Sequence, residues 1–178
     1  HPFFEIAYLG ASSRSAGQSY EKASRWRLEG RCPKVVRNLT VQDCSEIGVA
    51  SKNAEISNPL NDIEIVFSAL DSKVAGEIET WVIKLAKLHN QTTYIISNAS
   101  NHRMSSNVPL MIPEVNPDHL YLLYADGELQ KQAIITNPNC CAIPFSIALA
   151  PLKEAYGIEA VCVSTFQAVS GAGYPGES

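Results

Sequence analysis

The residues best suited to chemistry in this chain are Cys140 and Cys141, which directly follow the tripeptide Asn137-Pro138-Asn139. Asn and Pro at this density predict a turn, and Asn139 is a suitable N-cap for a following helix. The flanking patterns predict a strand over residues 132–136 and a helix from residue 140 to about residue 156. A cysteine pair is therefore expected at the N-terminus of a helix.

A thiol in that position has an environment suited to a nucleophile. The unpaired backbone N–H groups and the dipole of the helix both favour the thiolate, which is the reactive form of cysteine. A small, buried and inert cysteine fits the same spacing, because burial is the commoner fate of this residue. Spacing alone leaves both interpretations open.

A second candidate site follows a predicted strand over residues 3–9. The loop after it contains Ser12, Ser13, Arg14 and Ser15, and no acidic residue. In a dinucleotide-binding fold, an acid at this point binds the ribose 2′-hydroxyl, whereas an arginine among small hydroxyl residues suits a 2′-phosphate. If the chain has such a fold, the loop favours NADP; otherwise it is a polar surface loop.

A third candidate is Arg103, which lies in a polar loop over residues 98–104. The loop follows a predicted strand over residues 92–97, and open α/β sheets bind ligands at the carboxyl ends of their strands. Among Asn and Ser residues, a guanidinium group can clamp a phosphate or a carboxylate with two hydrogen bonds. The alternative is an ordinary solvated arginine.

These loops need a sheet to hold them, and the middle of the chain predicts one. Residues 63–70 form a short apolar run typical of a buried parallel strand, and Asp71 or Ser72 can cap a helix that ends near His89. Together with the strand over 92–97 this makes a βαβ unit with parallel strands. The helix positions expected on one apolar face are Val74, Ile78, Trp81, Val82, Leu85 and Leu88.

The remaining segments give weaker signals. Residues 35–41 are a possible strand, and residues 120–124 fit either an edge strand or one arm of a hairpin closed by residues 125–128. Residues 160–169 predict a strand that leads into a glycine-rich loop at 170–176. Gln167 is polar among apolar neighbours and needs a partner if it is buried.

Composition narrows the class of protein. The chain has 178 residues, 46% of them hydrophobic and 18% charged, with a net charge of −4, which argues against nucleic-acid binding. Its apolar runs are strand-sized, so no membrane span is expected. The five cysteines form no CxxC pair and predict reduced thiols in a cytoplasmic protein, and no metal site is expected. Because the chain begins without Met and ends in loop-like sequence, we expect a fragment.

The motifs resemble those of the aspartate-semialdehyde dehydrogenases, particularly the archaeal and fungal-type branch. Five segments match in the same order and span nearly the whole chain: residues 11–17, 97–104, 108–116, 135–140 and 165–173. The resemblance implies a Rossmann-type α/β domain over residues 1–139, followed over residues 140–178 by the start of an α+β catalytic and dimerisation domain. It also implies a homodimer or homotetramer for the complete protein.

The resemblance implies an NADP-dependent reaction between L-aspartate 4-semialdehyde, phosphate and L-4-aspartyl phosphate, which serves lysine, threonine and methionine synthesis. Cys140 matches the nucleophile, which would carry the substrate as a thioester. Gln167 matches a residue that positions the substrate, and Arg103 and Asn139 match substrate- or phosphate-binding positions. The residues that match cofactor-binding positions are Ser12, Ser13, Arg14, Ser15, Ser68, Ser170 and Gly171.

The chain also departs from the family pattern. The family's glycine-rich pyrophosphate turn would precede residue 1, and its acid/base histidine and substrate-binding arginine would follow residue 178. None of the four histidines takes the role of the base. We therefore expect the stretch alone to be inactive and poorly stable. Malonyl-CoA reductase, N-acetyl-glutamyl-phosphate reductase and a non-catalytic nucleotide-binding protein remain as alternatives.

Overall fold

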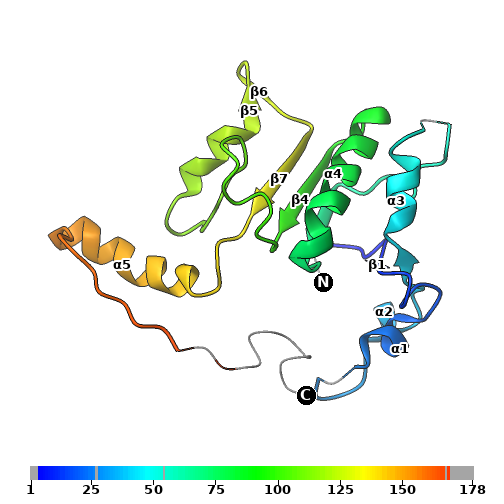
Figure 1. Ribbon diagram of the computed structural model, residues 1–178, viewed down its shortest axis with the longest axis horizontal. Helices are drawn as coiled ribbons and strands as arrows, with labels where there is room; N and C mark the ends of the chain where they lie inside the picture. The colour runs from blue at the N-terminus through cyan, green and yellow to red at the C-terminus, as the bar shows by residue number, and fades with distance from the viewer. Residues whose placement is uncertain (1–3, 27, 54, 167, 169–178) are drawn as a thin grey trace.

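A three-stranded parallel sheet forms the centre of the computed structural model, which describes residues 4–26, 28–53, 55–166 and 168 (Figure 1). Its strands are β3 (Ile65–Ser68), β4 (Thr93–Ser97) and β7 (Gln132–Thr136), in the order β3-β4-β7. The register pairs Ser68 with Ser97 and Ser97 with Thr136, so the three strands end level with one another. The predicted βαβ unit and the strand over 132–136 are confirmed.

Helix α4 (Ser72–Leu88) connects β3 to β4 and packs against the sheet. The Asp71 side chain caps it by accepting a hydrogen bond from the Lys73 amide at 2.9 Å, as the sequence predicts. The face that α4 buries consists of Ala75, Glu79, Val82, Leu85 and Ala86.

The predicted apolar face of α4 is correct only in part. Val74 and Leu88 are 45% and 47% exposed, whereas Val82 and Leu85 belong to the core. The buried face of α4 is narrower than the apolar pattern of the sequence suggests, because only the helix positions that project onto the strands are covered. That narrower face includes a carboxylate, Glu79, which the pattern did not indicate.

Helix α3 (Ser45–Ala50) packs on the side of α4. The two helices approach so closely at Gly48 that a Cβ atom there would lie 2.7 Å from the Trp81 ring. Only glycine leaves room for the indole at this crossing.

The N-terminal region contains less strand than predicted. Residues 4–9 carry no assigned strand, although the Leu9 carbonyl accepts a hydrogen bond from the Gln42 amide at 2.7 Å. Pairing continues through the short parallel strands β1 (Gly10–Ala11) and β2 (Gln42–Asp43). The short helix α1 (Tyr20–Ser24) lies between them along the chain.

The possible strand over residues 35–41 is wrong, because helix α2 (Lys34–Arg37) occupies its first half. Pro33 precedes the helix, where its fixed φ and missing N–H suit a helix start better than a strand. Residues 120–124 are likewise no edge strand, because most of them lie in a 3-10 helix, η1 (Pro117–Leu123).

The hairpin alternative for this region is the correct one. Strands β5 (Tyr124–Ala125) and β6 (Glu128–Leu129) pair antiparallel around Asp126 and Gly127, which both have positive φ. That is the geometry of a tight type I′ turn.

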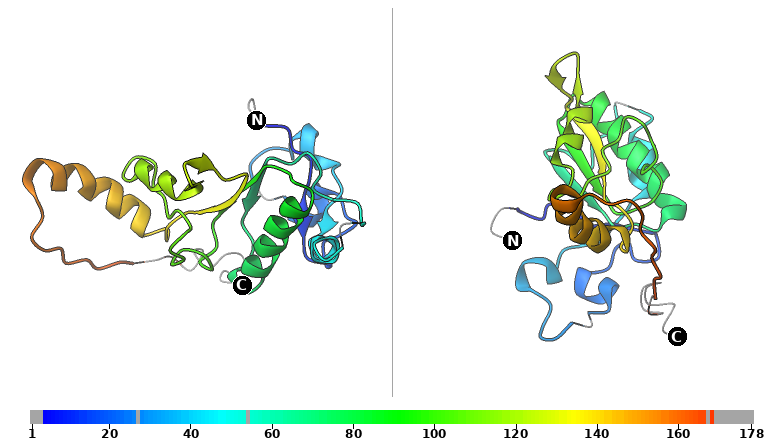
Figure 2. Two further views of the ribbon diagram at one scale, coloured as in Figure 1. Left: turned by 90° about the horizontal axis from the view of Figure 1, so that it is seen from above. Right: turned by 90° about the vertical axis from the view of Figure 1, so that its left-hand side faces the viewer.

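Helix α5 (Ala142–Tyr156) extends away from the sheet in Figure 1, and the left view of Figure 2 shows the same projection from above. The predicted strand over residues 160–169 is wrong over residues 160–166, which have no regular secondary structure. A strand needs a neighbour to bond with, and no pairing involves these residues in the described part of the chain. Among the described residues, no helix combines the length and apolar character needed to cross a membrane.

Candidate functional site at the carboxyl ends of the parallel strands

The carboxyl ends of β3, β4 and β7 bring two of the predicted loops together. The Asn98 amide donates to the Ser68 carbonyl at 2.9 Å, and the Asn137 amide donates to the Ser97 carbonyl at 2.9 Å. The Arg103 loop (residues 98–104) and the cysteine turn (residues 137–139) therefore leave neighbouring strands side by side. This edge of the sheet is where α/β folds bind ligands.

Arg103 joins the two loops. Its Nε donates to the Asn137 carbonyl at 2.8 Å, and its Nη2 donates to the Asn98 carbonyl at 2.9 Å. The side chain is half-buried, so it differs from the freely solvated arginine that the sequence also allowed. A guanidinium group has five N–H donors, and these two bonds leave three of them for an anionic ligand.

Asn139 holds the start of α5 through hydrogen bonds, although it is not the N-cap residue that the sequence predicted. Its Oδ1 accepts from the Cys141 amide at 2.8 Å, and its carbonyl accepts from the Ala142 amide at 2.9 Å. Regular helix begins at Ala142, two residues later than predicted, with Cys141 at the N-cap position. Cys140 thus lies directly before the N-cap residue of α5.

The two cysteines differ in exposure. Cys140 is exposed and Cys141 is partly exposed, which rules out a buried and inert Cys140. Three effects raise the pKa of the Cys141 thiol above its ordinary value. The largest is the hydrogen bond with Cys140, the second is the charge of Cys140, and the third is partial burial of the Cys141 thiol. A raised pKa lowers the fraction of Cys141 that is present as the reactive thiolate at neutral pH.

The serine-rich loop forms a compact turn directly after β1. The Ser12 carbonyl accepts from the amides of Ser15 and Ala16, at 2.9 and 3.2 Å, while Ser12, Ser13 and Arg14 are exposed. The nearest acid along β2, Asp43, uses its Oδ1 to accept from the Ser45 amide at 2.9 Å. The donors presented here, hydroxyl groups and a guanidinium, fit a phosphate group better than a neutral hydroxyl.

Ser68 lies at the same sheet edge, but its side chain is already engaged. It is 7% exposed, and its Oγ donates to Glu79 Oε1 at 2.6 Å. Sequence reasoning missed Glu79, and the available signal was a carboxylate spaced among the buried positions of α4. It also missed His102, whose Nε2 lies 3.5 Å from Glu79 Oε2.

With this geometry defined, comparison with known proteins assigns the family. The family model described as "Semialdehyde dehydrogenase, NAD binding domain" matches residues 1–123. The chain belongs to this semialdehyde dehydrogenase family. The resemblance drawn from the motifs and the Rossmann-type α/β fold class are thereby confirmed.

The relatives of this semialdehyde dehydrogenase chain carry one enzyme name. It is 42% identical over 182 residues to an aspartate-semialdehyde dehydrogenase of Cryptococcus neoformans, and 41% identical over 182 residues to one of Methanothermobacter thermautotrophicus. These alignments cover 100% and 99% of this chain but 46% of each relative. The chain spans about half the length of the curated relatives it matches.

Solved structures agree with this assignment. The crystal structure of aspartate-semialdehyde dehydrogenase with NADP from Candida albicans superposes with a TM-score of 0.68 and 34% sequence identity. The match covers 89% of this chain and 42% of that chain. An aspartate-semialdehyde dehydrogenase II from Vibrio cholerae gives a TM-score of 0.64 at 30% identity.

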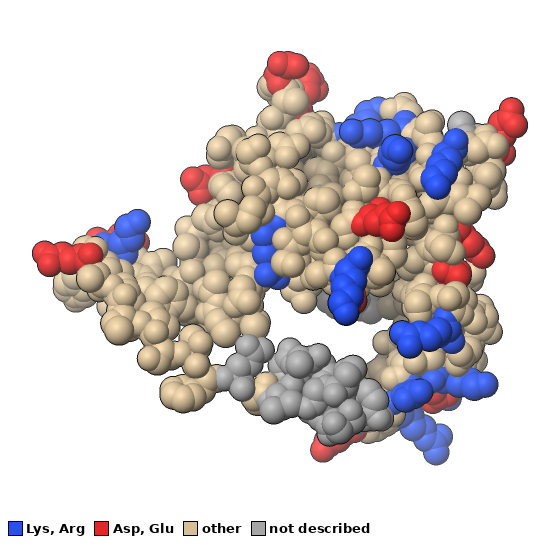
Figure 3. All heavy atoms as spheres, viewed as in Figure 1, with Lys and Arg blue, Asp and Glu red and all other residues tan. Residues whose placement is uncertain are grey.

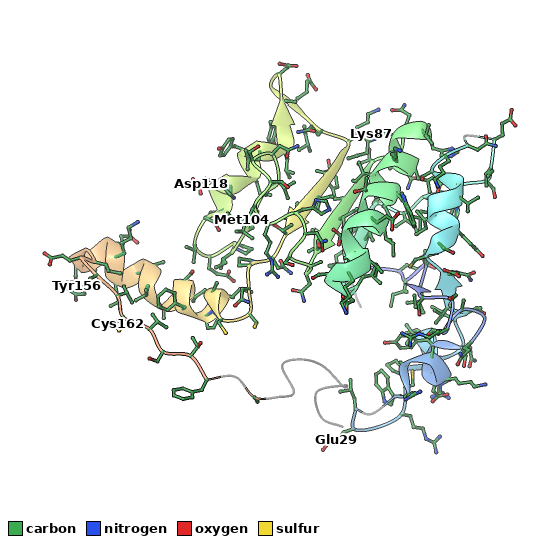
Figure 4. The ribbon with its side chains drawn as sticks, in the orientation of Figure 1. Glu29, Lys87, Met104, Asp118, Tyr156 and Cys162 are labelled. Carbon is green, nitrogen blue, oxygen red and sulfur yellow. The ribbon has the colours of Figure 1, made fainter. Side chains whose placement is uncertain are left out.

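Three site residues expected in this semialdehyde dehydrogenase, Gln167, Ser170 and Gly171, lie outside the described residues. Within the described part of the chain, no group of three or more His, Cys, Asp or Glu side chains is placed to hold a metal ion. Figure 4 labels Met104 at the end of the Arg103 loop and Cys162 on the segment beyond α5, well apart from it.

Proposed function

We propose that the protein containing this chain interconverts L-aspartate 4-semialdehyde and L-4-aspartyl phosphate, with NADP as the hydride carrier and inorganic phosphate as co-substrate. The observation that carries the proposal is the exposed Cys140 at the N-terminus of α5, directly beside the turn that Arg103 holds. The enzyme name shared by the relatives supports the choice of substrate.

Cys140 is the nucleophile in this proposal. Its thiolate attacks the aldehyde carbon to give a thiohemiacetal, and loss of a hydride from that carbon leaves a thioester on Cys140. Bound NADP supplies the acceptor for the hydride. Phosphate then attacks the thioester carbonyl, which releases the acyl phosphate and regenerates the thiolate.

Arg103 and Asn139 organise the residues around the thiol. Arg103 uses two of its five N–H donors for the bonds to backbone carbonyls. The other three donors provide a site for phosphate. Asn139 fixes the first amides of α5 and so sets where the thiol points. Gln167 is assigned to substrate positioning on the motif that it shares with the family.

We assign the cofactor's 2′-phosphate to Ser12, Ser13, Arg14 and Ser15, because the first three are exposed, Ser15 is partly exposed, and no acid in the loop competes with them. Ser170 and Gly171 are assigned to the nicotinamide side. Ser68 stays a cofactor-side prediction, and its contribution has to come through its backbone or through Glu79, since its hydroxyl is engaged.

The division of the chain at residues 139 and 140 into cofactor-binding and catalytic parts belongs to the same proposal. So does assembly of the complete protein into a homodimer or homotetramer. The described cysteines are all free, which supports a reducing compartment such as the cytoplasm.

The test uses the longest natural chain that contains this stretch. NADPH formation is followed from L-aspartate 4-semialdehyde and phosphate, with a Cys140→Ser variant alongside. Turnover that disappears in the variant supports the proposal. Binding of NADP without turnover contradicts it, and a parallel assay with malonyl-CoA and NADPH then decides whether the same thiol serves a malonyl-CoA reductase.

A further inference from the structure

Glu79 is a buried carboxylate beneath the candidate site. It lies on α4 with 1% of its surface exposed, in the row of buried residues that includes Ala75 and Val82. A carboxylate is costly to bury unless hydrogen bonds compensate for lost water. Its Oε1 accepts from Ser68 Oγ at 2.6 Å and from Ser97 Oγ at 2.7 Å. One oxygen therefore joins the carboxyl ends of β3 and β4.

The second oxygen of Glu79 faces the Arg103 loop. Oε2 lies 3.5 Å from Nε2 of His102, and both atoms are buried without a hydrogen bond to any described residue. The separation is too long for a strong hydrogen bond, but it is within range for an electrostatic contact. Glu79 thus contacts two strands and the loop at the same time.

The Arg103 loop is held at two further points, one on β4 and one on α4. Ser97 Oγ accepts from the Ala99 amide at 3.2 Å, and Asn101 Nδ2 donates to the Ser72 carbonyl at 2.9 Å. At Gly76, a Cβ atom would lie 2.8 Å from Asn101 Nδ2, so loop and helix are in close contact. The middle of the loop, around Asn101 and His102, is therefore packed against α4.

A continuous chain of contacts leads from this helix to the nucleophile. Glu79 fixes Ser97 and faces His102, the next residue is Arg103, and Arg103 bonds the Asn137 carbonyl at the start of the cysteine turn. We propose that Glu79 is a positioning residue, which holds the Arg103 loop in the orientation needed to bind phosphate beside the thiol. The phosphate part rests on the proposed function; the loop-holding part does not.

The test replaces Glu79 in the longest natural chain that contains this stretch. Glu79→Met fills the same volume with an unbranched apolar side chain but removes every polar contact. Glu79→Gln keeps an acceptor oxygen for the two serines. Glu77→Met is the matched control, because Glu77 is exposed on the same helix. Hydrogen exchange of the amides of residues 98–104 is measured by mass spectrometry, together with KM for phosphate and for NADP.

We expect Glu79→Met to speed exchange in the loop by at least about fivefold. KM for phosphate should rise by about tenfold while KM for NADP stays within about twofold. Glu79→Gln should recover part of both effects, and Glu77→Met should match the wild type. A general loss of packing would instead raise the KM for phosphate and the KM for NADP together, and Glu79→Gln would not bring either value back toward that of the wild type.

Unchanged loop exchange in Glu79→Met would overturn the proposal, and so would equal increases in the two KM values. If Glu79→Met does not fold, His102→Ala removes only the loop side of the contact from a side chain that is 22% exposed, and the same rise in exchange is expected. A wild type that turns over no semialdehyde refutes the proposed function, whereas the exchange comparison still decides whether Glu79 holds the loop.

Discussion

Replacing Arg103 with lysine gives a direct test of how the site is held together. The guanidinium reaches two backbone carbonyls at once, that of Asn137 at 2.8 Å and that of Asn98 at 2.9 Å. A lysine ammonium keeps the charge, but it lacks the planar fork that serves both carbonyls. We therefore expect Arg103→Lys to loosen the cysteine turn from the neighbouring loop and to slow the reaction at Cys140.

The magnitude follows from the lost hydrogen bond. A hydrogen bond to a charged group contributes about 1.5–3 kcal/mol, and lysine can replace one of the two bonds. The bond at Asn137 is half-buried, whereas the bond at Asn98 is exposed and counts for less. Loss of one bond in the transition state corresponds to a fall in kcat/KM of about 10- to 150-fold. Arg103→Ala, which loses both bonds, should fall further.

The assay is NADPH formation at varied phosphate, because a phosphate-binding role adds a rise in KM for phosphate to the fall in kcat. Arg37→Lys is the matched control. The Arg37 guanidinium also makes two hydrogen bonds to a backbone carbonyl, that of Cys32, but it lies on α2 outside the site. Its kcat/KM should stay within about twofold of the wild type. An Arg103→Lys enzyme with kcat/KM within about threefold of the wild type would refute the reasoning.

Three further outcomes are expected. Gly48→Ala should lower the free energy of unfolding by about 1–3 kcal/mol in urea denaturation, because the new methyl group overlaps the Trp81 ring; an unchanged midpoint would contradict the packing. Cys140→Ala should lower the pKa of Cys141, because the variant lacks the hydrogen bond that raises this pKa. Alkylation of Cys141, followed against pH by peptide mass spectrometry, should then begin at lower pH in the variant. An unchanged onset would argue against contact between the thiols. Burial raises the pKa of Tyr8, so the unfolded chain releases the Tyr8 proton at lower pH than the folded chain, and the free energy of unfolding falls as pH rises past about 10. Tyr8→Phe should lessen that fall in thermal melts recorded between neutral and alkaline pH. Curves of melting temperature against pH that run parallel for the variant and the wild type would contradict this prediction.

The sequence predicted the elements whose signal is local. The run at β3, the capped helix α4 and the strands β4 and β7 combine strong periodicity with clear boundaries, and the structure confirms all four. The strand expected over residues 160–169 shows the limit of that signal. Val161 and Val163 favour a strand, yet they are about half exposed because no strand lies beside them in the described part of the chain.

The candidate site also contains residues whose placement local sequence predicts and one residue whose placement depends on the folded sheet. The placement of Cys140, Arg103 and Asn139 at one edge of the sheet was predictable, because the ends of parallel strands meet at one edge and turn chemistry is local, whereas their roles stay predictions. Glu79 was not, although its spacing with Ala75 and Val82 is visible in the sequence. The serines that make its burial tolerable come from the strands β3 and β4, so their contribution appears only after the sheet has formed beside α4.

The surface over α5 is mostly uncharged on the face shown in Figure 3. Among the residues of α5, Phe145, Ile147 and Leu152 are between 39% and 49% exposed. An apolar surface of this kind is typical of a helix that packs against another protein surface.

The two edges of the central sheet also differ in their openness to other chains. On the β7 side, residues around Leu110 run alongside the strand: the Pro109 carbonyl accepts from the Thr136 amide at 2.8 Å, and the Met111 amide donates to the Thr136 carbonyl at 3.0 Å. Proline cannot extend a hydrogen-bonded ladder, so this edge is blunted beside the nucleophile. On the β3 side, β3 pairs only with β4 among the described residues, and the Phe4 ring packs edge-on against Phe67. A preparation of these 178 residues alone should therefore aggregate by strand addition at β3, while the β7 edge is protected from it.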